Sequence, residues 1–210
     1  MKPTAYVINL ARRPERWQRT QELWSPWFEL VRFPAVEIAC DGARGCILSH
    51  EAAAVQALRD QPMAIVFEDD LVPTPHFEKI GLDCLTDAEK YCNHWDYINC
   101  GPYLDCTPIR LPRASLSPTV SPLFFQATHS QQTHFVCYNR NSLPLLQAAL
   151  TSPIALDVFL GRNAKRQWVA ARLLATQADG PSDIIQHTVD IHKPLLYQLT
   201  EQMLENASHL

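Results

Sequence analysis

An apolar run that ends in three consecutive acids constrains this chain more than any other feature. Residues 63–67 read Met-Ala-Ile-Val-Phe, and Glu68, Asp69 and Asp70 follow directly. A buried strand cannot hold three carboxylates in its interior, so the acids must lie at its carboxyl end. In an open α/β sheet, ligands bind at that edge. The sequence therefore predicts a polar site at the end of a buried strand.

The three neighbouring carboxylates repel one another, and a bound divalent cation usually neutralises this repulsion. Hard cations such as Mg²⁺ or Mn²⁺ prefer carboxylate oxygens and often hold a substrate diphosphate as well. The alternative interpretation is a solvated turn in which one acid caps the next helix. The strongly apolar strand before the acids favours the metal site.

Strand-like and helix-like segments alternate through the first hundred residues, which predicts parallel β-α-β units with helices on both faces of the sheet. Five prolines between residues 102 and 123 predict irregular structure with some edge strand, suited to an acceptor or lid loop. Strands are expected at residues 4–10, 30–36, 64–67, 95–100, 133–138 and 168–176, and helices at residues 14–29, 46–59, 75–91, 142–150, 154–163 and 197–206.

Length and charge limit the possible functions. The 210 residues suffice for one full domain and are too few for two ordinary ones. The formal net charge of -4, without any Lys/Arg block, gives no reason to expect a nucleic-acid partner. The first residues hold too short an apolar run for a signal peptide, and no stretch approaches the roughly 18–20 apolar residues of a membrane span.

The cysteine pattern indicates a reducing compartment. The number of cysteines is odd, and no two of them form a C-x-x-C pair. This argues against a zinc site and against a disulfide framework, and predicts reduced, mostly buried thiols in the cytosol. The seven cysteines are Cys40, Cys46, Cys84, Cys92, Cys100, Cys106 and Cys137.

A basic cluster follows the first expected strand. That strand ends at Asn9-Leu10, and Arg12, Arg13 and Arg16 come next. Arginine forks match phosphate oxygens, and the end of a first strand is a usual seat for a nucleotide in α/β folds. The alternative is a solvated first turn of helix.

A second anion site is possible at residues 41–45, which read Asp-Gly-Ala-Arg-Gly before an expected helix. Free backbone N–H groups at a helix start can hold an anion, and Arg44 would add charge. The segment is neither G-x-G-x-x-G nor a P-loop, which counts against a dehydrogenase and a P-loop enzyme. A simple turn is the alternative. His50 follows one turn into the helix, where a satisfied, partly buried histidine is the commoner case.

Two residues farther along the chain complete the candidates. A neutral imidazole at His192 could complete a metal shell begun by Asp70. Asp157 stands among apolar neighbours in residues 154–160. Such an acid is either paired with an arginine, for which Arg162 is a candidate, or held as a base with a raised pKa.

Several of these motifs together resemble one family. Val7-Ile8-Asn9-Leu10 followed by Arg13 and Arg16 resembles the V-I-N-L-x-R…R opening of the lipooligosaccharide galactosyltransferase family, which also includes the collagen galactosyltransferases. Gly45-Cys46-Ile47-Leu48-Ser49-His50 is similar to its G-C-x-x-S-H motif, and Val66-Phe67-Glu68-Asp69-Asp70 to its hydrophobic-E-D-D motif. The resemblance is strong over residues 6–72, looser later on, and matches nothing over residues 102–132.

The resemblance implies a single-domain GT-A type (Rossmann-like) α/β fold with a mixed, mostly parallel sheet flanked by helices. It implies an inverting, galactosyltransferase-like reaction that moves a hexose from a UDP-sugar to a hydroxyl group. The acceptor would be a glycan, a lipid-linked glycan or a glycoprotein, as in glycan and lipopolysaccharide synthesis. Mn²⁺ or Mg²⁺ would be the cofactor. Residues 1–100 of the domain 1–210 would bind the nucleotide-sugar, and residues 101–210 would form the acceptor side. We expect a cytoplasmic protein and leave peripheral association with a membrane open.

We assign the expected roles as follows. Metal ligands are Asp70 first and His192 second. Catalytic residues are Asp157, as the base that takes the acceptor proton, and Asp69, which with Glu68 would hold the ribose or a metal-bound water. The nucleotide-sugar site takes Asn9, Arg12, Arg13, Asp41, Arg44, His50 and Glu68. Another metal-dependent nucleotide-sugar enzyme, a hydrolase or nucleotidyltransferase, and a non-catalytic sugar-binding module remain the alternatives.

Overall fold

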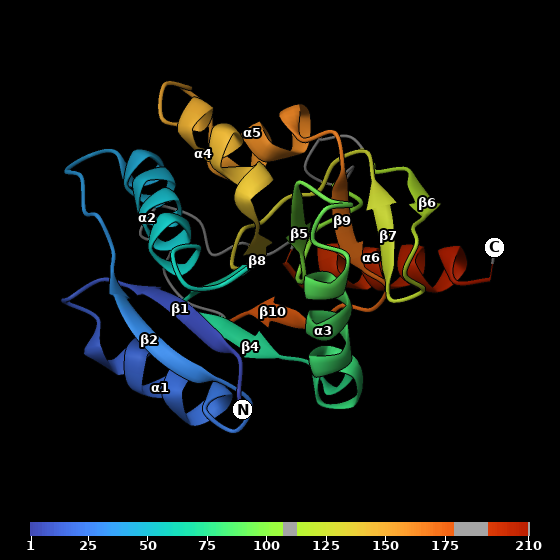
Figure 1. Ribbon diagram of the computed structural model, residues 1–210, viewed down its shortest axis with the longest axis horizontal. Helices are drawn as coiled ribbons and strands as arrows, with labels where there is room; N and C mark the ends of the chain where they lie inside the picture. Colours follow the sequence, from blue (N-terminus) through green and yellow to red (C-terminus); the bar gives the residue numbers. More distant parts are fainter. Residues whose placement is uncertain (107–112, 179–192, 210) are drawn as a thin grey trace.

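Three parallel strands form one end of a mixed sheet: the apolar strand pairs with the first strand of the chain, which in turn pairs with the second (the first and second strands are labelled in Figure 1). The computed structural model describes residues 1–106, 113–178 and 193–209. In this part of the chain, eight strands follow the order β2-β1-β3-β8-β5-β9-β7-β6. Their bounds are β1 (Thr4–Asn9), β2 (Glu29–Pro34), β3 (Ala64–Glu68), β5 (Tyr97–Asn99), β6 (Leu116–Pro118), β7 (Phe124–Ala127), β8 (Phe135–Tyr138) and β9 (Gln167–Ala170).

Strand direction differs between the two ends of the sheet. β1 runs parallel to both β2 and β3, as the alternation of strands and helices predicted. β8 enters between β3 and β5 and runs antiparallel to both, while β5 and β9 are parallel. The last two strands, β7 and β6, are antiparallel additions. The predicted α/β class, with a mixed sheet flanked by helices, is confirmed.

Helices cover both faces of the sheet. On one face, α1 (Pro14–Trp24) and α3 (Leu82–Lys90) enclose a core rich in aromatic rings. On the other face, α2 (Gly42–Ala57), α4 (Leu143–Ala149) and α5 (Leu156–Asn163) pack on a mainly aliphatic core, which also contains the rings of Phe33, Tyr97 and Tyr138.

The fully buried Trp24 fixes α1 beneath the acidic turn. Its ring lies 5.0 Å from that of Phe67, and its Nε1 donates to the Leu71 carbonyl at 3.0 Å. The acids between these two residues are therefore held against the core on this side.

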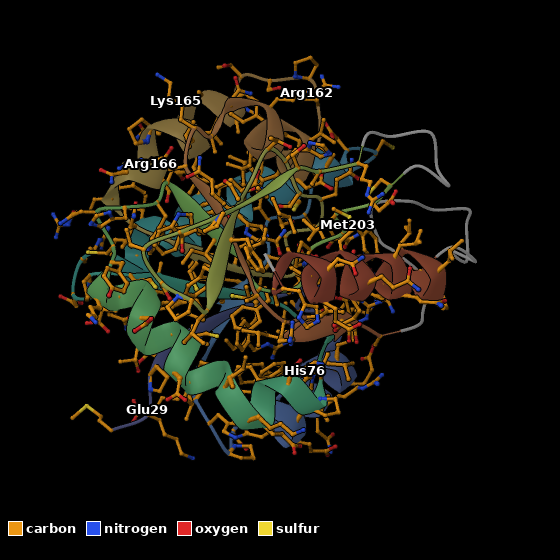
Figure 2. The ribbon with its side chains drawn as sticks, turned by 90° about the vertical axis from the view of Figure 1, so that its right-hand side faces the viewer. Glu29, His76, Arg162, Lys165, Arg166 and Met203 are labelled. Atoms are coloured by element: carbon orange, nitrogen blue, oxygen red, sulfur yellow. The ribbon has the colours of Figure 1, made fainter. Side chains whose placement is uncertain are left out.

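The C-terminal helix α6 (Lys193–Ala207) closes the far end of the sheet. Its Met203 and Leu204 share a core with β7 and β9 residues such as Phe125 and Val169. Figure 2 shows α6, with Met203 labelled, passing above the segment that carries His76. His76 Nε2 lies 3.9 Å from Glu201 Oε2 on that helix. Among the described residues, no helix is long and apolar enough to cross a membrane.

Element boundaries differ from the expected ones for local reasons. The helix expected to reach residue 29 ends at Trp24, because Pro26 cannot continue it. The helix expected from residue 46 begins at Gly42, because the Asp41 side chain accepts the Arg44 N–H at 2.9 Å and caps it. The weakly patterned segment 75–91 forms a π-helical turn, η1 (Phe77–Gly81), before α3.

The strand expected over residues 168–176 is divided. Its second part is β10 (Ala175–Gln177), which leaves the main sheet and pairs antiparallel with β4 (Leu71–Pro73). β4 has no counterpart among the expected strands, because only three residues of extended chain follow the acids. This small ribbon places Gln177 beside the acidic turn.

Candidate functional site

The three acids diverge at the carboxyl end of β3. Glu68 is the last residue of β3, and its side chain turns toward α2. Asp69 turns toward α1, where Arg16 and Thr20 contact it. Asp70 turns toward β10 and accepts a hydrogen bond from Gln177. The acids thus have three different environments, although they are adjacent in the sequence.

Glu68 is the carboxylate with the most side-chain partners on the α2 side. Its Oε1 accepts the Thr133 hydroxyl at 2.8 Å and lies 3.3 Å from His50 Nε2. The other ring nitrogen of the buried His50 lies 3.1 Å from the Tyr138 hydroxyl. Burial acts to raise the pKa of Glu68, but His50, the nearby His134 and Thr133 outweigh it and the pKa is lowered.

Asp69 forms hydrogen bonds that attach α1 to the end of β3. Its Oδ2 accepts from Asn9 Nδ2 at 2.6 Å, and its Oδ1 accepts from Arg16 Nη1 at 3.1 Å. Its backbone carbonyl accepts the Thr20 hydroxyl at 3.1 Å. Burial raises the pKa of Asp69 despite the opposing effect of Asn9 and Arg16. Both carboxylate oxygens therefore already have partners within the protein.

The two carboxylate oxygens of Asp70 differ in their hydrogen bonds. Its Oδ2 accepts from Gln177 Nε2 at 2.7 Å, and Arg16 Nη1 lies 4.0 Å from the same oxygen. Among the described residues, none forms a hydrogen bond with its buried Oδ1. Burial, followed by the charges of Glu68 and Asp69, raises the pKa of Asp70 to about 7. A buried carboxylate oxygen without a partner is costly, so this position suits a cationic ligand.

A cavity of about 550 Å³ opens at this edge of the sheet. Its lining includes the three acids and much of the segment between β2 and α2. That segment contributes apolar side chains, which include Val36 and Ile38. The residues that line the cavity are Ile8, Leu10, Arg12, Arg16, Ala35, Val36, Glu37, Ile38, Ala39, Cys40, Asp41, Gly42, Gly45, Cys46, Ser49, His50, Glu68, Asp69, Asp70 and Gln177.

The start of α2 is pressed against the cavity wall. A Cβ on Gly45 would lie 2.4 Å from the Val36 carbonyl oxygen, so only glycine allows this approach. The Ser49 hydroxyl donates to the Gly45 carbonyl at 2.7 Å and accepts the Val36 N–H at 2.8 Å. These contacts fix one turn of α2, which carries Cys46 and His50.

Cys46 and His50 form a group with Glu68 that could hold a metal ion. Their potential ligand atoms all lie within 4.8 Å of one another. Burial, followed by the charges of Glu68, Asp157 and Asp70, raises the pKa of the Cys46 thiol. The negative charges of these three acids therefore all disfavour the thiolate form of Cys46.

Asp157 lies in the first turn of α5 and accepts backbone N–H groups. Its Oδ2 accepts from Gln132 at 3.2 Å and its Oδ1 accepts from Val158 at 2.8 Å. Gln132 has a left-handed backbone, with a φ of 76°, which is uncommon for a side chain of this type. Burial is the main cause that raises the pKa of Asp157, and the charge of Glu68 adds to it. The role predicted for Asp157 as a base stays a prediction.

The structure brings most of the predicted site residues to one cavity. Arg12, Asp41, His50 and the three acids all line it. Arg12 Nε also lies 2.8 Å from Glu37 Oε1 on the same wall.

Other predicted residues lie apart from the cavity surface. Among the described residues, the lining does not include Asn9, Arg13, Arg44 or Asp157. Asn9 is buried behind it, where its amide contacts Asp69, the Arg13 carbonyl and Arg32. Arg13 Nη1 lies 3.9 Å from Glu15 Oε1. His192 lies outside the described residues. The roles predicted for all these residues stay predictions.

Sequence reasoning missed Cys46, Thr133 and Gln177 as members of the site. The spacing of Cys46 and His50, four residues apart on a helix, was a usable signal. Thr133 and Gln177 come from elements distant in the sequence, and no local pattern marks either of them. Their places depend on the pairing of β8 with β3 and of β10 with β4.

No family model and no curated protein matches this chain. Among solved structures, the chain is similar to A197 from STIV, with 14% identity and a TM-score of 0.43 over 89% of this chain and 99% of that one. It is also similar to mannose-1-phosphate geranyltransferase from Thermus thermophilus, with 12% identity and a TM-score of 0.42 over 81% and 74% of the two chains. The resemblance to the galactosyltransferase family stays a prediction.

Proposed function

We propose that this protein is a metal-dependent inverting glycosyltransferase that moves a hexose from a UDP-sugar to a glycan hydroxyl. The observation that carries the proposal is the meeting of the three sequence motifs at one cavity. Leu10 and Arg16 come from the first motif, His50 from the second, and the three acids from the third. A cavity of about 550 Å³ is in the size range of small-molecule and cofactor sites.

The residues present fit a hard divalent cation. Within the part of the chain that the structure describes, the buried Asp70 Oδ1 has no partner, and Glu68 and Asp69 add negative charge beside it. Carboxylate oxygens are the ligands that Mn²⁺ and Mg²⁺ prefer. Asp70 would hold the ion. Such an ion neutralises charge on a departing diphosphate.

Arginine and apolar side chains support the binding of a nucleoside diphosphate. Arg16 lies beside Asp69 and Asp70, so its guanidinium is close to where a phosphate bound at these acids would be. Arg12 stands on the rim of the same cavity. Leu10, Val36 and Ile38 give the cavity an apolar side on which a base could pack. Residues 1–100 would thus form the donor half of the chain and residues 101–210 the acceptor half.

Asp157 is our candidate for the catalytic base. Inversion requires one group to take the proton from the attacking hydroxyl. The burial that raises the pKa of Asp157 makes its carboxylate a better proton acceptor. The bonds from Gln132 and Val158 hold the carboxylate at the start of α5. Asp69 and Glu68 would position the ribose or a bound water.

A thermal-shift screen of nucleotide-sugars, with and without Mn²⁺, tests the proposal. A ligand that binds the native state raises the melting temperature, so the screen reports the nucleotide and the sugar. We expect UDP-sugars to raise it only when Mn²⁺ is present. No shift with any nucleotide-sugar would contradict the proposal. Fast release of sugar from the hit, without an acceptor, would identify a hydrolase instead.

A further inference from the structure

Cys46, His50 and Glu68 differ in chemistry from the ligands that a hard cation prefers. They offer one sulfur, one imidazole nitrogen and one carboxylate oxygen. Borderline cations such as Zn²⁺ take this mixture of donors, whereas Mg²⁺ and Mn²⁺ favour oxygen. The ligands suited to a borderline cation and those suited to a hard cation are different residues at the same edge of the sheet. Asp70 lies on the β10 side, and Cys46 lies on α2.

The three ligand atoms are close to the spacing that a tetrahedral ion needs. Zinc bonds of about 2.0–2.3 Å place two ligand atoms about 3.3–3.8 Å apart in a tetrahedron. His50 Nε2 and Glu68 Oε1 are already 3.3 Å apart. All three atoms lie within 4.8 Å of one another, so closure around an ion requires a movement of about 1 Å.

Two ligands are oriented by outer hydrogen bonds. The Tyr138 hydroxyl lies 3.1 Å from His50 Nδ1, which leaves Nε2 for the Glu68 side. The Thr133 hydroxyl donates to Glu68 Oε1 at 2.8 Å. Outer partners of this kind fix the direction of a metal ligand. His50 is fully buried, so its ring cannot turn to solvent for another partner.

We propose that Cys46, His50 and Glu68 form a binding site for a borderline divalent cation of the zinc class, distinct from the hard-cation position at Asp70. Three protein ligands leave a fourth position for water or a substrate oxygen, as in catalytic zinc sites. All three residues line the cavity, so that position is open to it. The site departs from the expectation based on cysteine pairs, because its second ligand is a histidine four residues along a helix.

Titration of the metal-free full chain with Co²⁺ tests this site. Cobalt reports thiolate ligation through a near-ultraviolet charge-transfer absorption, and four-coordination through its visible bands. We expect both signals to saturate at one Co²⁺ per chain and to disappear when Zn²⁺ is added. Absence of the charge-transfer band from the wild-type chain overturns the proposal.

Variants assign the signal to these residues. We expect Cys46→Ser to lose the charge-transfer band and Cys40→Ser, at an exposed cysteine that lines the same cavity, to keep it. Tyr138→Phe should weaken Co²⁺ binding about 10–100-fold while the band persists. An unchanged spectrum in Cys46→Ser overturns the proposal. If that variant does not fold, an unchanged spectrum in His50→Gln does so.

The experiment separates this site from the proposed glycosyltransferase function. Asp70→Asn should keep the Co²⁺ spectrum while it loses Mn²⁺-dependent donor binding. Cys46→Ser should lose the spectrum, whatever its effect on the donor. A Co²⁺ spectrum that disappears in Asp70→Asn would show one shared site and would overturn the proposal of two.

Discussion

Two aspartates, one just before a strand and one just after a strand, show how differently this fold treats an acid. Asp96, just before β5, accepts the backbone N–H groups of Lys165 and Arg166 through Oδ2, at 3.0 and 2.9 Å. Its Oδ1 accepts from Arg166 Nε and Nη2 at 3.0 and 2.7 Å. Asp70, just after β3, accepts one hydrogen bond from Gln177, and no described residue hydrogen-bonds to its buried Oδ1.

The difference separates an acid that stabilises the fold from one that is available to a ligand. Asp96 holds the start of β9 against β5, and the structure provides all its partners. Burial removes water from the Asp70 carboxylate, which disfavours its charged form and raises its pKa to about 7. Polar groups that are left unpaired within a well-paired fold are the ones to examine for function.

Replacing Asp157 should have the largest effect on turnover. Asp157→Asn removes the proposed base, and general-base groups contribute roughly 100-fold to 10,000-fold in rate. We expect transfer to an acceptor, found from a panel of glycans, to fall by at least about 100-fold. Donor binding should be retained, because Asp157 lies outside the lining among the described residues. Unchanged transfer would show that another group takes the proton.

Replacing Asp96 should have the largest effect on stability. Asp96→Ala leaves the Lys165 and Arg166 N–H groups without their acceptor. We expect the free energy of unfolding to fall by roughly 2–4 kcal/mol, measured by urea denaturation. Asp60→Ala, at an exposed acid beyond α2, is the control and should change little. Equal stabilities of the two variants would remove the contrast between Asp96 and Asp70.

Stability should depend on pH through Asp70 in the metal-free protein. Its pKa in the folded state is about 7, above the ordinary value of 3.8, so the folded state binds the proton more tightly than the unfolded state. The stabilisation is present at low pH and is lost as the pH rises through 7. Asp70→Asn lacks this loss, so its advantage over wild type should grow by on the order of 1–3 kcal/mol between pH 5 and pH 8. Parallel stability curves would contradict the environment assigned to Asp70.

A smaller effect is expected at Thr133. Thr133→Val removes the hydroxyl that donates to Glu68 Oε1 and should lower stability by about 1 kcal/mol. It should also raise the pKa of Glu68, because that hydrogen bond favours the ionised form. NMR titration of the labelled glutamate checks the pKa. No change in it would mean that Thr133 has only a packing role.

The sequence allowed the parallel end of the fold and the position of the acids to be predicted. The run from Ala64 to Glu68 combines an apolar strand with an abrupt change to charge, so its own pattern determines its place. The antiparallel direction of β8 could not be predicted from the sequence. The direction of a strand depends on how the chain connects it to its neighbour, and the alternation of side chains along the strand is the same in both directions.

The partners of the acids were harder to predict than the acids themselves. Gln177 reaches Asp70 only because β10 leaves the main sheet and pairs with β4. Asn9 was assigned to the nucleoside from its place at the end of β1, and its amide contacts Asp69 and Arg32. Which neighbour a polar side chain meets depends on tertiary packing that no local window contains.

Calorimetric titration of UDP, with and without Mn²⁺, tests the central claim most directly. Wild type, Asp70→Asn and the exposed control Asp60→Asn are compared at one pH. The open carboxylate at Asp70 predicts that wild type and Asp60→Asn bind UDP with the same affinity and only with Mn²⁺, and that Asp70→Asn does not bind. An Asp70→Asn variant that binds UDP with wild-type affinity and the same need for Mn²⁺ would contradict it.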